Sequence, residues 1–192
     1  MAQTQAINQL FFLIFGLILT SLFISTFRVG INAVSDDTRR YWLLSLGGRS
    51  AAFFSWAAVP FLGTSFTVIA NGLFVFSAGC LALLFRSWRA PVPLRIPLAV
   101  IVFSLVVAGG MEAIRQSGLG FELRMILIGS ASLAISSWEL SELHNKIKTE
   151  SDSSLKLIAG VVVLGAFMSI LDITVVNVAL PTLSVEFGTP GD

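Results

Sequence analysis

Asp172 stands out among the charged residues because it lies within one of the most apolar segments of the chain. Residues 157–171 precede it and residues 173–176 follow it, and both stretches are almost wholly apolar. Apolar surroundings disfavour a charged carboxylate, which suits proton exchange at a membrane site. The alternative is that residues 157–171 nearly cross a bilayer on their own, so that Asp172 marks a helix end near the outer interface.

Arg49 is the other charge with an unusual position, since it lies inside the hydrophobic stretch that begins near Tyr41. A guanidinium at mid-membrane depth costs about 2.5–3.5 kcal/mol on insertion scales and would be a functional candidate. Residues 41–48 can instead lie along the membrane interface, with the Arg49 head group reaching lipid phosphates. We favour this second interpretation, and Arg49 stays the candidate intramembrane charge under the first.

The composition indicates a membrane as the solvent. Of the 192 residues, 55% are hydrophobic and 12% are charged, whereas soluble domains have about 25% charged residues. A soluble fold of this size would expose Phe and Leu over much of its surface, so we expect an integral membrane protein whose partner is the lipid bilayer. The 12 Lys and Arg residues are balanced by 11 Asp and Glu residues, which argues against nucleic acid as a partner.

The sequence offers few groups for catalysis or metal binding. Cys80 is the single cysteine and His144 the single histidine, so the usual zinc clusters and an intramolecular disulfide are excluded. No Ser/His/Asp, Cys/His or glycine-rich phosphate-binding pattern occurs in a supporting context. We therefore expect the chain not to be an enzyme and to hold no cofactor and no metal.

Hydropathy predicts an all-α, multipass integral membrane protein with about six transmembrane helices. Residues 50–85 carry no charge and would far exceed a bilayer as one helix at about 1.5 Å per residue, so they must fold back. Pro60 and the Gly-Thr-Ser sequence at 63–65 supply the turn of this hairpin. The expected spans are residues 10–27, 41–62, 66–85, 96–111, 125–138 and 157–183.

A charged segment, residues 139–156, separates the fifth and sixth spans, and we expect a solvated linker there. Glu142 and Lys146 have the i,i+4 spacing of a helical ion pair. The chain is thus expected to comprise a five-helix membrane module (1–150), a linker (151–156) and a single helix (157–192).

Basic residues predict the direction of the spans. Arg115 and Arg124 lie on one side of the expected membrane. The segments on the other side contain Arg28, Arg39, Arg40, Arg86, Arg89, Arg95, Lys146, Lys148 and Lys156. By the positive-inside tendency the richer side is cytoplasmic, which places both termini outside a bacterial inner membrane. If the short fifth span did not cross, the C-terminus would move inside.

The sixth span contains a specific pattern, Leu-Asp-x-Thr-x-x-Asn-x-Ala-Leu-Pro at residues 171–181. It resembles the first transmembrane helix of drug:proton antiporters of the major facilitator superfamily, in the multidrug-efflux branch. The resemblance covers residues 154–188. It implies that Asp172, Thr174, Asn177 and Pro181 occupy the transport motif, with the acid near a proton-coupled pathway for small hydrophobic drugs.

Residues 1–150 resemble a different group, the multi-helix membrane sensor regions that precede diguanylate cyclase or kinase domains in bacterial signalling proteins. The resembling features are Tyr41-Trp42 at the start of the second span, the hairpin around Pro60, Ala70-Asn71 in the third span, and Arg124 before the fifth. This resemblance implies that a charged helix leaves the module toward an output domain.

The two resemblances predict two functions. The first is a fragment or fusion related to a multidrug efflux transporter, not competent for transport alone, because such transporters need two bundles of about six helices. The alternative is a membrane-embedded sensory or signal-input module that lacks its output domain. In either case small-residue pairs such as Gly48 and Ala52 are expected to support helix association, within or between chains.

Overall fold

The computed structural model describes residues 2–29, 36–118 and 121–149, and all regular structure in these residues is α-helical. The expected linker at 151–156 and the expected helix at 157–183 lie outside the described residues. The helices are α1 (Ala2–Val29), α2 (Asp36–Leu62), α3 (Phe66–Ser87), α4 (Arg95–Gln116) and α5 (Phe121–Thr149). Met1–Leu143 forms one compact unit, and His144–Asp192 forms a second, of which the structure describes the end of α5.

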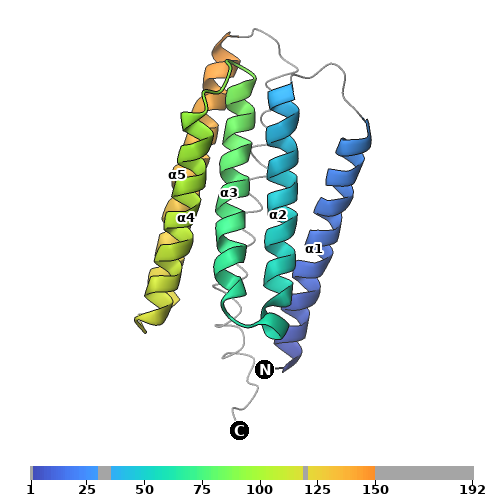
Figure 1. The fold of residues 1–192 in the computed structure, drawn as a ribbon, viewed down its shortest axis with the longest axis vertical. Coiled ribbons are helices and arrows are strands. Elements are labelled where there is room, and N and C mark those ends of the chain that lie inside the picture. Colours follow the sequence, from blue (N-terminus) through green and yellow to red (C-terminus); the bar gives the residue numbers. More distant parts are fainter. Residues whose placement is uncertain (1, 30–35, 119–120, 150–192) are drawn as a thin grey trace. The chain divides into compact units, whose positions relative to one another are not determined.

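Within the first unit, helices that follow one another in the sequence lie side by side and antiparallel (Figure 1). Helix α2 packs between α1 and α3, and α4 packs on α3. Helix α5 joins α3 and α4 through an apolar cluster of Val75, Val107, Ala131 and Ile135. Helix α3 is therefore the central element, and it has the largest buried share of the apolar helices.

The hairpin between α2 and α3 confirms the turn predicted around Pro60. Pro60 lies in the last turn of α2, and the helix ends at Leu62. Gly63 adopts a positive φ of 93°, a conformation that costs a residue with a side chain. Its amide donates to the Val59 carbonyl at 2.8 Å, which closes the helix end.

Four of the described helices are long and apolar enough to cross a membrane, namely Gln9–Arg28, Phe66–Ser87, Arg95–Gln116 and Glu122–Asn145. The large apolar side chains of α1 and α4 are mostly on the outside of the bundle, among them Leu17, Leu98 and Leu105. An apolar exterior of this kind is typical of helices that face lipid. The structure thus supports an α-helical membrane protein. Helix α2, which contains Arg49, is not among the four helices that are apolar enough to cross a membrane.

Small residues allow close approach of neighbouring helices, as the sequence predicted for Gly48 and Ala52. A Cβ atom built on Gly48 would lie 3.2 Å from the Cβ of Ser77 on α3, and Ala52 is fully buried. Between α1 and α2 the hydroxyls of Thr20 and Ser50 lie 2.6 Å apart. These residues therefore pack helices within one chain.

Helices α4 and α5 extend beyond the expected fourth and fifth spans, residues 96–111 and 125–138, and the stretches long and apolar enough to cross a membrane are Arg95–Gln116 and Glu122–Asn145. Helix α4 runs past residue 111 to Gln116, and Glu112 accepts hydrogen bonds from Arg115 and Gln116 one turn later. Helix α5 runs past residue 138 to Thr149. Glu139 and Glu142 are buried, so residues 139–143 belong to the bundle and do not form the solvated linker that was expected.

Candidate functional site: the charged contacts of helix α5

One face of α5 changes from apolar to acidic along its length while remaining buried. Among the described side chains of this helix, those of Ala131, Ile135, Glu139, Glu142 and Leu143 are buried. Their spacing of three or four positions places them on one stripe of a helix with 3.6 residues per turn. A buried carboxylate requires a cation or hydrogen-bond donors to offset lost hydration. Glu142 on this stripe contacts two arginines from another part of the bundle.

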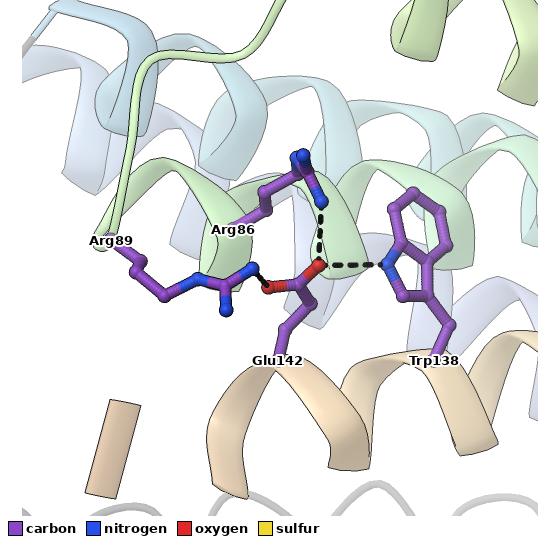
Figure 2. Close-up of polar contacts among 4 residues, drawn as sticks. All are labelled: Arg86, Arg89, Trp138 and Glu142. Atoms are coloured by element: carbon purple, nitrogen blue, oxygen red, sulfur yellow. Dashed lines mark hydrogen bonds and ion pairs between the residues drawn. The ribbon is translucent and has the colours of Figure 1, made fainter. Parts of the chain in front are cut away.

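Glu142 is held by three donors (Figure 2). Its Oε1 accepts a hydrogen bond from Arg86 Nη1 at 2.8 Å, and its Oε2 accepts one from Arg89 Nη2 at 2.7 Å. The indole N–H of Trp138 donates to Oε1 at 3.2 Å. Arg86 lies in the last turn of α3 and Arg89 in the turn that follows. Both oxygens of Glu142 therefore tie α5 to the end of α3.

Glu142 makes its described contacts across the fold, and the side chain of Lys146 lies outside the described residues, so its expected pairing with Glu142 stays a prediction. Arg86 and Arg89 are more than fifty positions away from Glu142 in the sequence. Two guanidinium groups on one carboxylate leave this group of three with a net charge of +1. The Nε of Arg86 is buried and has no acceptor among the described residues.

Glu139 lies one turn before Glu142 and interacts electrostatically with Arg49 of α2. The Nε of Arg49 donates to the hydroxyl of Ser77 at 3.4 Å. Its guanidinium carbon lies 5.5 Å from the centre of the Phe74 ring, a cation–π distance. Ser77 is at the middle of α3, so the Arg49 head group lies against the centre of that helix.

We use the term α5 charged site for Arg49, Arg86, Arg89, Glu139 and Glu142. The site joins α5 to α3 through Arg86 and Arg89, and Glu139 lies within electrostatic range of Arg49 on α2. It contains no nucleophile, and no group of three or more His, Cys, Asp or Glu side chains suited to a metal occurs in the described part of the chain. What this arrangement can do is hold α5 in one position by charge pairs that a displacement of the helix would break.

The structure places the sequence candidates unequally. Arg49 is part of the α5 charged site, and its intramembrane position stays a prediction. Asp172, Thr174, Asn177 and Pro181 lie outside the described residues. Sequence reasoning missed Glu139 and Glu142, although their spacing from Ala131 and Ile135 extends the buried stripe of α5 and was a usable signal.

The comparisons with known proteins add no family to this description. No protein-family model, curated protein or solved structure matches the chain.

Proposed function

We propose that residues 1–149 form a membrane-embedded signal-input module in which α5 is the output helix. The observation that carries the proposal is the burial of Glu139 and Glu142 on a helix that continues without a break to Thr149. A helix fixed to its neighbours by charge pairs has a preferred position. A displacement of α5 by one turn or less would break those pairs. Two-position elements of this type convert a local change into a conformational signal.

The orientation of the module follows from its charges. The end of α1, the start of α2, the end of α3 and the start of α4 lie at the same end of the bundle (Figure 1). The residues of these helix ends include Arg28, Arg39, Arg40, Arg86 and Arg95. We call this end of the bundle the basic end. Arg115 and Arg124 belong to the opposite end. The positive-inside tendency favours a cytoplasmic basic end in a bacterial inner membrane, so α5 would leave the bilayer toward the cytoplasm.

A distance measurement on the full chain tests the proposal. Spin labels at Ala90→Cys and Ser141→Cys, both exposed positions, report the position of α5 relative to the turn after α3. Cys80→Ala removes the native thiol. In lipid nanodiscs, double electron–electron resonance should give one dominant distance between the two labels in the Cys80→Ala protein. Adding Glu142→Gln should give a distance that differs from it by about 2 Å or more.

The control is Glu122→Gln, which makes the same chemical change at an exposed position of α5. It should keep the original distance. If Glu142→Gln and Glu139→Gln both retain the original distribution, α5 has no second position to report and the signal-input function is refuted.

A second candidate, a fragment or fusion related to a proton-coupled drug efflux transporter, is favoured by the motif at Asp172, Thr174, Asn177 and Pro181. Under this proposal the chain alone does not transport, so proteoliposomes that contain it should show no efflux of ethidium driven by a proton gradient. Gradient-driven efflux that is lost in Asp172→Asn and retained in Asp37→Asn, a change at an exposed acid, would show that the chain transports by itself and would overturn this proposal.

A further inference from the structure

We propose that Arg86 and Arg89 bind the head group of an anionic phospholipid at the basic end of the bundle, beside Glu142. The inference concerns a ligand of this end of the protein. It holds whether or not α5 transmits a signal.

Arg86 and Arg89 have more N–H donors than Glu142 uses. A guanidinium has five N–H groups, and Glu142 engages one nitrogen of Arg86 and one of Arg89. The side chains of the two arginines are 28% and 35% exposed, whereas that of Glu142 is 5% exposed. The carboxylate is thus enclosed while the arginines reach the surface. Their outer N–H groups suit a phosphate, which arginine binds with paired hydrogen bonds.

The charge of this cluster favours an anionic ligand. The two arginines and Glu142 have a net charge of +1. Phosphatidylglycerol carries one negative charge and would neutralise this excess, whereas phosphatidylcholine is neutral overall. Other arginines at the basic end, such as Arg40 and Arg95, add to the attraction for anionic lipid.

The surface that follows the arginines in the sequence fits a lipid better than a soluble anion. Trp88 is partly exposed beside Arg89, as is common for tryptophan at a membrane interface. Leu94 and Leu98 follow at the start of α4 and are 82% and 58% exposed. A ligand held at Arg89 would have its acyl chains next to this apolar surface, so the site combines a phosphate-binding end with a hydrocarbon-facing side.

Native mass spectrometry of the full chain measures the binding directly. The chain is mixed with lipid in detergent micelles and then released from the micelles in the mass spectrometer. The wild-type chain should bind phosphatidylglycerol more tightly than phosphatidylcholine with the same acyl chains. Arg89→Gln removes the net charge of the cluster while leaving Glu142 its contact with Arg86. Because a direct hydrogen bond to a charged group contributes about 1.5–3 kcal/mol, this variant should weaken phosphatidylglycerol binding about tenfold or more.

Arg40→Gln is the matched control, because it removes one positive charge from the same end at an exposed position. It should weaken binding about fivefold at most, because it removes the general attraction of one charge without a direct contact to the phosphate. An equal loss in Arg40→Gln and Arg89→Gln would show unspecific attraction and overturn the site. Equal affinity of the wild-type chain for the two lipids would also overturn it.

Two further arms keep the test decisive. If Arg89→Gln does not fold, as judged by circular dichroism, the discrimination between the two lipids by the wild-type chain decides the proposal. Inorganic phosphate at millimolar concentration should not displace the lipid. Displacement by phosphate alone would identify a free-phosphate site and overturn the assignment to a lipid.

Discussion

Glu142→Gln should destabilise the helix bundle because it removes the charge shared by Arg86 and Arg89 and keeps the side-chain shape. Breaking a buried ion pair costs about 3–5 kcal/mol. Here the carboxylate is 5% exposed but the arginines are 28% and 35% exposed, so water can solvate them after the change. We therefore expect a loss of about 2 kcal/mol in the free energy of unfolding, which is below that range.

Thermal unfolding in nanodiscs, followed by circular dichroism, measures this loss. For a chain of 150–250 residues, about 1 kcal/mol shifts the Tm by about 2–4 °C, so Glu142→Gln should lower the Tm by about 4–8 °C. Glu122→Gln on the exposed part of the first turn of α5 should lower it by about 1–2 °C through its weaker effect on the helix dipole. If the two variants unfold at the same temperature, the contacts of Glu142 do not stabilise the bundle and the reasoning is refuted.

Two other predictions concern packing between neighbouring helices. Gly79→Ala should destabilise the bundle by about 1–3 kcal/mol because the new methyl group would overlap Val100 Cγ1. Gly109→Ala is the control, because the space around Gly109 is open, and it should stabilise α4 by up to about 1 kcal/mol. A Tm that rises in both variants would contradict the close contact between Gly79 and Val100. Thr20→Ala and Ser50→Ala, which remove the two sides of a 2.6 Å hydroxyl contact, should show a coupling of about 0.5–1 kcal/mol in a double-mutant cycle of unfolding free energies, and strictly additive losses would count against the contact.

The helices themselves follow from local features of the sequence. Pro60 and Gly63 end α2 where the hairpin was predicted, because these residues restrict or release backbone angles whatever their neighbours are. The ends of α4 and α5 do not follow from hydropathy. A charge such as Glu112 signals the end of a lipid-facing stretch, but its pairing with Arg115 lets the helix continue.

The charged site depends on contacts that sequence spacing does not reveal. Glu142 looked like a solvated residue because its local neighbours are polar, and its partners Arg86 and Arg89 come from another helix and turn. Arg49 was recognisable as an unusual charge, yet its contacts with Ser77 and Phe74 arise from the antiparallel packing of α2 on α3. The helical stripe from Ala131 to Glu142 was the local signal that these acids are buried.

The carboxylate of Glu142 ties α5 to α3, and a double-mutant cycle between Arg86→Gln and Glu142→Gln tests this contact most directly. Unfolding free energies of the wild-type chain, both single variants and the double variant would be measured in nanodiscs. The ion pair at 2.8 Å predicts a coupling energy of about 1–2 kcal/mol between the two positions. Losses that add to within about 0.5 kcal/mol would mean that the two side chains act independently, which would contradict the claim.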